Sequence, residues 1–181
     1  MPEAKYRGAE MRYSMKNSKA IVQALKSAGI DFVATLPDSY NTQVHKLIRE
    51  DASFRWVVAT REDEAMAIAG GAFLGGKKPC VIMEASGYGN SAGFLARICV
   101  VHHIPFLILS SHVGALGEMF YHHSETRYLA EPILKGCGVP YCTLMNINDV
   151  ETIIREAQLT VEGQKIPVAV LIPRHIYYEG V

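Results

Sequence analysis

Three acidic side chains at the beginning of a helical pattern are the first residues whose type and spacing suggest chemistry. Segment 60–72 opens on Thr60 and Arg61, continues with Glu62, Asp63 and Glu64, and then runs mostly in alanine and glycine. Small residues at helical spacing leave one helix face nearly free of side-chain bulk, so another group can approach it closely. A structural interpretation is also open, in which Thr60 caps the helix and each acid offsets its macrodipole by about 0.3–1 kcal/mol.

Two further loops contain residue types that suit a bound ligand. The run Ser-Gly-Tyr-Gly-Asn at 86–90 permits close backbone approach and opens a helix, an arrangement that can bind phosphate. It is neither a Walker loop nor a dinucleotide-binding GxGxxG motif, and a tight turn with positive φ explains it equally well. Asp38 follows Pro37, where a carboxylate can act on a ligand or simply form a turn or helix cap.

A pair of histidines, His122 and His123, lies in a long polar loop, and loops of such length are often functional. Adjacent side chains point in different directions, so the pair is poorly suited to chelating one metal ion. Proton transfer near neutral pH suits it better. Two solvated surface histidines remain the alternative. No chemistry is assigned to His102 and His103, because histidine at the end of a helix is favourable with the helix dipole.

These loops are separated by alternating apolar runs and helical patterns. Strands are expected at 32–35, 56–59, 80–83, 105–109, 140–144 and 168–172. Continuous apolar runs are typical of strands that are buried on both faces of a parallel sheet. The sequence therefore predicts a doubly wound α/β fold, with a mainly parallel sheet and helices on both faces. Ligands of such folds bind beyond the carboxyl ends of the strands, where the four polar loops are expected.

The composition of the chain limits which classes of protein and which kinds of binding partner are expected. The 181 residues suit one domain, expected at 15–181 after a loose segment at 1–14. The chain has 18 basic and 18 acidic residues and no basic run, which favours neither nucleic acid nor an anionic membrane surface as a partner. The four cysteines form no CxxC pair and no segment has the apolar length of a membrane span, so a cytoplasmic protein with reduced thiols is expected. No metal ligands are assigned.

Together, the four loops resemble the pyrimidine-binding domain of thiamine diphosphate enzymes. The resemblance is strongest to the separate alpha subunits of the sulfopyruvate and phosphonopyruvate decarboxylase family, and it covers nearly the whole chain after Met15. Glu62 meets the pattern of a glutamate followed at fixed offsets by alanines and a glycine, whereas Glu64 does not. The other segments that carry the resemblance are Leu36-Pro37-Asp38-Ser39, the run Gly-Gly-Lys-Lys-Pro at 75–79, and the run at 86–90.

The resemblance implies roles for individual residues. Glu62 would hydrogen-bond the pyrimidine ring of the cofactor, for which its carboxyl must carry or share a proton. In pyruvate- and indolepyruvate-decarboxylase-like enzymes, an aspartate in the first loop and a histidine pair after the fourth strand are catalytic. This implies general acid–base roles for Asp38, His122 and His123. Asp38 departs from that pattern, because it follows proline instead of glycine and an extra serine separates it from Tyr40. The residues implied to bind the cofactor are Glu62, Pro37, Ser86, Gly87, Tyr88 and Asn90.

The resemblance also implies a partner and a reaction. Enzymes of this superfamily hold the diphosphate through Mg²⁺ at a Gly-Asp-Gly motif in a second domain, and no Gly-Asp-Gly occurs in this sequence. A beta subunit that carries the Mg²⁺ site is therefore expected, in an α2β2 or larger assembly. The expected reaction is decarboxylation of a 2-oxo acid with release of CO2 and an aldehyde. Carboligation with the same cofactor and a non-catalytic scaffold subunit are the alternatives.

The identity of the 2-oxo acid is open between two chemistries. A sulfonate or phosphonate group would require a basic clamp, whereas an apolar or aromatic 2-oxo acid would require an aromatic pocket. The candidates for the clamp are Arg61, Arg97 and Arg127, and those for the pocket are Tyr40, Phe120 and Tyr121.

Overall fold

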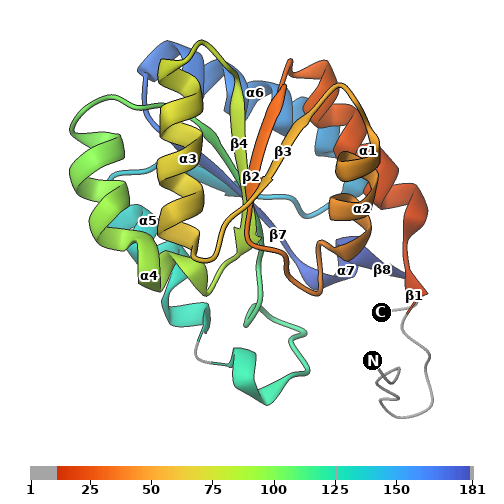
Figure 1. Cartoon of the computed structure of the whole chain (residues 1–181). Coiled ribbons are helices and arrows are strands. Elements are labelled where there is room, and N and C mark those ends of the chain that lie inside the picture. The colour runs from red at the N-terminus through yellow and green to blue at the C-terminus, as the bar shows by residue number, and fades with distance from the viewer. Residues whose placement is uncertain (1–11, 125, 180–181) are drawn as a thin grey trace.

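The computed structural model describes residues 12–124 and 126–179, and its centre is a six-stranded parallel sheet (Figure 1). The strand order is β3-β2-β4-β5-β7-β6, and every neighbouring pair in it is parallel. The strands are β2 (Phe32–Thr35), β3 (Arg55–Val58), β4 (Pro79–Glu84), β5 (Leu107–Ser111), β6 (Tyr141–Thr143) and β7 (Val168–Ile172). Each of the six expected strands is present, with ends shifted by at most two residues.

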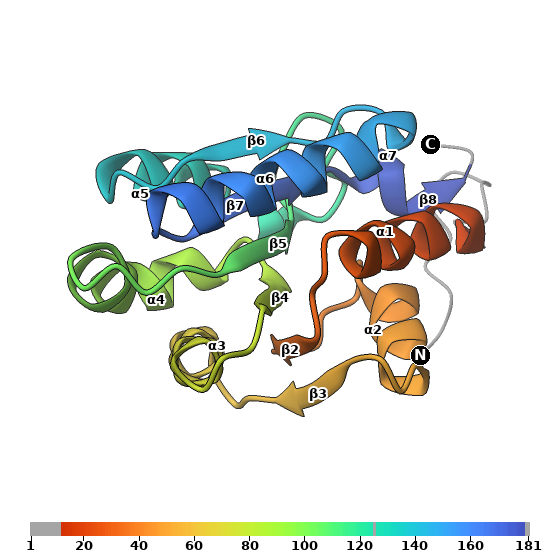
Figure 2. The same cartoon turned by 90° about the horizontal axis from the view of Figure 1, so that it is seen from above.

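Helices cover both faces of the sheet, as Figure 2 shows from above. Helix α1 packs against α2 and α6 on one face, while α4 packs against α3 and α5 on the other. The helices of the first face are α1 (Met15–Ser27), α2 (Thr42–Glu50) and α6 (Val150–Gln164). Those of the second face are α3 (Glu62–Leu74), α4 (Gly87–Phe94), continued by a π-helix at Leu95–Val100, and α5 (Ala130–Gly136). The predicted doubly wound α/β fold is therefore confirmed.

The central strands form the core because their side chains are apolar on both sides. Every residue of β5 and of β7 is buried, and only the last residue of β4, Glu84, is partly exposed. Two-sided burial of this kind is the reason why the strands appear in the sequence as unbroken apolar runs.

The two ends of the described chain pair with each other beside the main sheet. Strand β1 (Arg12–Tyr13) is antiparallel to β8 (Tyr178–Glu179), which follows the short helix α7 (Arg174–Tyr177). Ser14 caps α1, because its side chain accepts a hydrogen bond from the backbone N–H of Asn17. Residues 12–14 are thus part of the folded domain, which corrects the expected loose segment 1–14; the remainder of that segment, 1–11, lies outside the described residues.

The order of the strands places a topological switch point between β2 and β4. The chain passes from β2 outward to β3 and then returns to add β4 on the other side of β2. At such a switch point the loops at the carboxyl ends of the two strands separate, and ligands of doubly wound folds bind there. The loops that flank it contain Asp38 after β2 and Ser86 after β4. The long loop that follows β5 extends beyond the same edge of the sheet, at the bottom of Figure 1.

No helix in the described ranges 12–124 and 126–179 combines the length and the apolar character that crossing a membrane requires.

Candidate active site

Glu62 is the first residue of α3, and its carboxyl is almost completely enclosed. The residue is 8% exposed, and the side-chain amide of Asn90 donates a hydrogen bond of 3.0 Å to its Oε2. The other oxygen, Oε1, has no hydrogen-bond partner among the described residues. Glu62 therefore presents one oxygen that is held in place and one that is free to bond a ligand.

Gly87, at the start of α4, packs directly against the Glu62 side chain. A Cβ atom at position 87 would lie 2.9 Å from both Cβ and Cδ of Glu62, which is closer than real Cβ contacts come. Further along α3, Ala65 and Ala69 are completely buried, so the predicted small face does allow close packing. Glycine is thus required at position 87 for Glu62 to keep its position.

The two acidic neighbours of Glu62 have different roles. Asp63 is bonded to the guanidinium of Arg61 at 2.9 and 3.1 Å. The Glu64 carboxylate accepts hydrogen bonds of 2.7 Å from both the backbone N–H and the hydroxyl of Thr60. The interpretation of Thr60 as the helix cap is wrong, because Arg61 occupies the N-cap position and the carboxylate of Glu64 reaches backward instead. Only Glu62 of the three acids faces the inside of the site.

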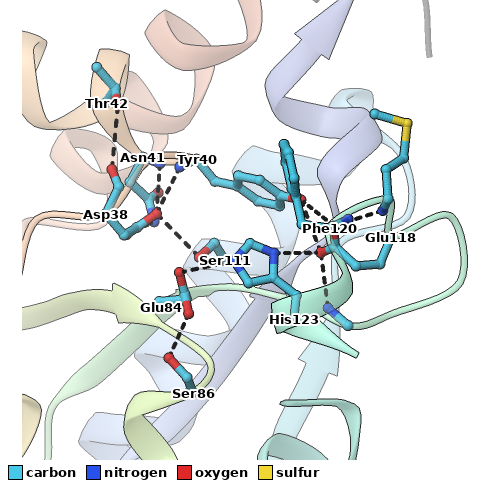
Figure 3. Close-up of polar contacts among 12 residues, drawn as sticks. Asp38, Tyr40, Asn41, Thr42, Glu84, Ser86, Ser111, Glu118, Phe120 and His123 are labelled. Carbon is cyan, nitrogen blue, oxygen red and sulfur yellow. Dashed lines mark hydrogen bonds and ion pairs between the residues drawn. The ribbon is translucent and has the colours of Figure 1, made fainter. Parts of the chain in front are cut away.

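Asp38 lies beside the switch point and accepts hydrogen bonds from four donors (Figure 3). Its Oδ1 accepts from the backbone N–H groups of Tyr40 (2.9 Å) and Asn41 (3.0 Å) and from the hydroxyl of Ser111 (3.3 Å), and its Oδ2 accepts from the Asn41 side chain (2.8 Å). Burial raises the pKa of the Asp38 carboxyl, and these donors offset part of that increase. Three of the four donors converge on Oδ1, which fixes the direction of the carboxylate. In this structure Asp38 ties the β2–α2 loop to the end of β5.

His123 is buried within the loop after β5, and its ring is held by Glu118. The Nδ1 atom lies 3.0 Å from Oε2 of Glu118, while the exposed fraction of both side chains is below a tenth. The Tyr40 hydroxyl donates to the same carboxylate at 3.0 and 3.2 Å. His122, the second member of the pair, is exposed, and its ring centre lies 4.3 Å from that of His123. The alternative of two solvated surface histidines therefore holds for His122 and is wrong for His123.

Glu118 organises the loop by accepting hydrogen bonds from its backbone. The N–H groups of Gly114, Met119 and Phe120 donate to it at 3.1, 2.8 and 2.9 Å. Burial by itself would raise the pKa of the Glu118 carboxyl, but these three donors and the nearby His123 outweigh it and lower the pKa. Glu118 is consequently a carboxylate at neutral pH.

A second carboxylate, Glu84 at the end of β4, faces the other side of the His123 ring. Its Oε2 lies 3.8 Å from Nε2 of His123, and its Oε1 accepts a 2.6 Å hydrogen bond from the hydroxyl of Ser86. The polar contacts shown in Figure 3 therefore run from Glu118 through His123 and Glu84 to Ser86, which immediately precedes Gly87. This series of contacts leads from the loop after β5 toward the start of α4.

The remaining predicted site residues differ in their access to a ligand. Pro37 and Asn90 are exposed and Ser86 is half-buried. Tyr88 is completely buried, and its hydroxyl bonds that of Ser110 at 3.1 Å. The structure thus brings Glu62, Gly87 and Asn90 together and joins Ser86 through Glu84 to His123. No part of Tyr88 is exposed, so the prediction that it contacts the cofactor is not supported by its burial.

Sequence reasoning missed Glu118, Glu84 and Ser111. Glu118 precedes His123 by five residues in a loop with no regular periodicity, so no local pattern pairs the two. Glu84 and Ser111 occupy the final position of their strands. Their position at the ends of strands could have identified Glu84 and Ser111, because polar side chains at the carboxyl ends of adjacent parallel strands meet at one edge of the sheet.

The candidate residues for substrate recognition are also separated by the structure. Arg127, Phe120 and Tyr121 line a cleft of about 390 Å³ beside the long loop. Arg61 is paired with Asp63, and Tyr40 is 1% exposed, so neither is available as expected. Arg97 lies exposed on the π-helix that continues α4.

The described residues fit a pyrimidine ring better than a metal ion. A nearly buried carboxylate with one free oxygen, next to a glycine and a helix face of small residues, suits a flat ring that offers a nitrogen for hydrogen bonding. In the ranges 12–124 and 126–179, no group of three or more His, Cys, Asp or Glu side chains is arranged to hold a metal ion.

Comparisons with known proteins identify the family of the chain. Residues 15–127 match the family described as thiamine pyrophosphate enzyme, N-terminal TPP binding domain. Over 165 residues the chain is 34% identical to sulfopyruvate decarboxylase subunit alpha of Methanocaldococcus jannaschii, a match that covers 91% of this chain and 97% of the relative. It is 28% identical over 159 residues to phosphonopyruvate decarboxylase of Streptomyces viridochromogenes, covering 86% of this chain and 40% of that protein.

A solved structure shares the fold. The 2-oxoglutarate:ferredoxin oxidoreductase from Magnetococcus marinus superposes with a TM-score of 0.74 at 16% identity, over 96% of this chain and 31% of that one. At this level of identity the likeness concerns the fold alone.

Proposed function

The chain belongs to the thiamine pyrophosphate enzyme family, among relatives of the sulfopyruvate decarboxylase alpha subunit, and on this premise we propose that it is the alpha subunit of a 2-oxo acid decarboxylase. The reaction releases CO2 and an aldehyde. The observation that carries the proposal is the enclosed carboxyl of Glu62, which is fixed by Asn90 on one oxygen and has no partner among the described residues on the other.

Thiamine diphosphate, when bound, supplies the electron sink that decarboxylation of a 2-oxo acid needs. In this proposal Glu62 hydrogen-bonds the pyrimidine ring, and Asn90 and Gly87 keep the Glu62 carboxyl in place. Pro37, Ser86 and the exposed residues Gly89 and Asn90 form the walls of the cofactor site, and the buried Tyr88 supports them from beneath. Close contact between α3 and α4 excludes water from the carboxyl, which strengthens its hydrogen bond.

Proton transfer is assigned chiefly to His123. It is the buried histidine of the pair, and one of its ring nitrogens is free of the Glu118 hydrogen bond. Asp38 acts by orienting the loop after β2, since its carboxylate bonds the backbone of Tyr40 and Asn41 and the side chain of Asn41. His122 is exposed and contributes to the entrance of the site. General acid–base catalysis of this kind is worth about 10²–10⁴-fold in rate.

The proposal includes a second subunit. Three relatives carry the designation subunit alpha in their names, among them that of Methanocaldococcus jannaschii. The partner is a beta subunit that provides Mg²⁺ and the diphosphate site, in an assembly of α2β2 or larger.

The proposed substrate class is a 2-oxo acid with a second anionic group. The names of the relatives include sulfopyruvate and phosphonopyruvate decarboxylases, and Arg127 lies at the cleft beside the long loop. An arginine can bind a sulfonate or phosphonate through two parallel hydrogen bonds. Phe120 and Tyr121 line the same cleft, so an aromatic 2-oxo acid is the competing substrate to include in the assay.

The test is an aldehyde-release assay on the chain coexpressed with its partner subunit, with thiamine diphosphate, Mg²⁺ and a series of 2-oxo acids. We expect Glu62→Gln to lower activity by at least about 10²-fold. Glu64→Gln is the matched control, because it makes the same change two residues away, at an exposed carboxylate that bonds the backbone and hydroxyl of Thr60. Full activity of Glu62→Gln would identify the chain as a scaffold subunit. Cofactor binding without aldehyde release, but with product formation after an aldehyde is added, would indicate carboligation.

A further inference from the structure

The contacts of His123 with two carboxylates define how its ring is held. We propose that Glu118 is a positioning residue that fixes His123 as the Nδ1–H tautomer, so that Nε2 is the proton-donating atom and Glu84 returns the proton to it. This inference rests on the proposed function, because the proton in question is the one that decarboxylation consumes.

The tautomer follows from the donors around Glu118. Three backbone N–H groups and the Tyr40 hydroxyl point at its oxygens, so the group is an acceptor and carries no proton of its own. A hydrogen bond of 3.0 Å between Oε2 and Nδ1 of His123 then requires the hydrogen to be on Nδ1. Nε2 is left as the nitrogen that can lose and regain a proton.

The loop is built so that this contact is rigid. Gly114 has φ +78°, and a Cβ there would lie 2.7 Å from the backbone nitrogen of Arg127, so the turn that presents its N–H to Glu118 needs glycine. The ring of His123 is also enclosed by the edge of Tyr40 at 5.9 Å and by Phe120 at 5.6 Å between ring centres. With Nδ1 fixed, the direction of Nε2 is fixed as well.

The proton balance of the reaction matches this arrangement. Conversion of a 2-oxo acid anion to an aldehyde and CO2 takes up one proton, which replaces the carboxylate on the carbonyl carbon. The bond between Nε2 and its hydrogen breaks, the new C–H bond forms, and the ring returns to its neutral Nδ1–H form. Glu84, 24% exposed, lies 3.8 Å from Nε2 and can take a proton from solvent and pass it to the ring.

The groups that face His123 come from three parts of the fold. They are Glu84 from β4, Glu118 and His122 from the loop after β5, and Tyr40 from the loop after β2. Two of the four are carboxylates on opposite sides of the ring, one beside each ring nitrogen. Removing either carboxylate therefore changes what one specific nitrogen of His123 meets.

The first experiment reads the tautomer directly. Full-length protein labelled with ¹⁵N-histidine is examined by NMR in the reconstituted complex, and the His123 signals are identified by their absence in His123→Gln. We expect the wild-type ring, when neutral, to carry its hydrogen on Nδ1, and Glu118→Gln to shift the population toward Nε2–H. If the neutral wild-type ring carries its hydrogen on Nε2, the proposal is wrong. This result comes from the wild-type protein and so does not depend on the folding of any variant.

The second experiment measures kcat and KM separately. Glu118→Gln should lower kcat about 10²-fold with little change in KM. Glu84→Gln should also lower kcat, and it should increase the solvent deuterium isotope effect. An increase in KM with an unchanged kcat in Glu118→Gln would show that Glu118 is structural only.

Glu162→Gln is the matched control for both experiments. Glu162 is an ion-paired glutamate on α6 whose Oε1 lies 2.8 Å from Nζ of Lys78, just before the start of β4 and so at the opposite edge of the sheet from the candidate site. Its kinetic constants should equal those of the wild type. If the wild-type complex releases no aldehyde while the His123 ring is protonated on Nδ1, the proposed function fails and the positioning of His123 stands.

Discussion

The side chain of Glu62 occupies the space that a Cβ atom would need at Gly87. This contact joins the first turns of α3 and α4. The carboxyl of the same side chain accepts a hydrogen bond from Asn90 through one of its two oxygens. The position of the candidate catalytic carboxyl thus depends on the absence of a side chain 25 residues later in the sequence.

Gly87→Ala should displace Glu62 and lower the activity of the reconstituted complex by about 10²-fold, since a shift of about 1 Å in a positioned group costs that much. Thiamine diphosphate affinity, measured by calorimetry, should fall with it. Gly93→Ala in the same helix has open space at its Cβ and should leave activity unchanged. Unchanged cofactor affinity in Gly87→Ala would contradict the role of Gly87.

The two adjacent histidines should differ in importance. His123→Gln removes the buried ring held by Glu118 and should lower kcat about 10²–10⁴-fold. His122→Gln alters an exposed ring and should have a much smaller effect. Steady-state kinetics of the two variants measures the difference, and equal losses would count against the assignment of proton transfer to His123.

Asp38→Asn should destabilise the fold, because its amide nitrogen would face hydrogen-bond donors instead of acceptors. We expect a loss of about 1–3 kcal/mol in the free energy of unfolding, measured by denaturant titration. Asp149→Asn is the control, since Asp149 occupies the N-cap of α6 without a side-chain cap hydrogen bond. A large loss of activity with unchanged stability would show instead that Asp38 acts on the substrate.

Stability should fall in mild acid because of His45. Burial lowers the pKa of His45 to about 4, compared with about 6.5 in an unfolded chain. The unfolded state therefore binds more protons between these values, so stability decreases as the pH falls from about 6.5 to 4, by roughly 3 kcal/mol in total.

The variant His45→Gln should remove most of this pH dependence. It contains no titrating ring, and its amide can still donate to the Thr35 hydroxyl that His45 contacts at 3.2 Å. His102→Gln, at an exposed position, should keep the wild-type dependence. The measurement is the free energy of unfolding at several pH values from 4 to 7, and an unchanged slope in His45→Gln would refute the attribution.

Several features of the molecule could be predicted from short stretches of the chain. The apolar runs of β5 and β7 indicated a sheet buried on both faces, and the acids followed by small residues indicated a closely packed helix, at whose start the family resemblance singled out Glu62. These predictions succeed because strand burial and helix periodicity leave their pattern within about ten consecutive residues.

The pairing of side chains across the site was decided only by the tertiary structure. Glu118 meets His123 and Tyr40 because an irregular loop folds back over the sheet edge, and Asp38 meets Ser111 because β2 and β5 end at the same edge. Thr60 does not cap α3 as expected, because its backbone N–H and hydroxyl donate hydrogen bonds to the Glu64 carboxylate. Such contacts depend on the path of the backbone between distant segments, which no local periodicity encodes. The sequence thus determined which residues could react, and the fold decided which of them are held in place to do so.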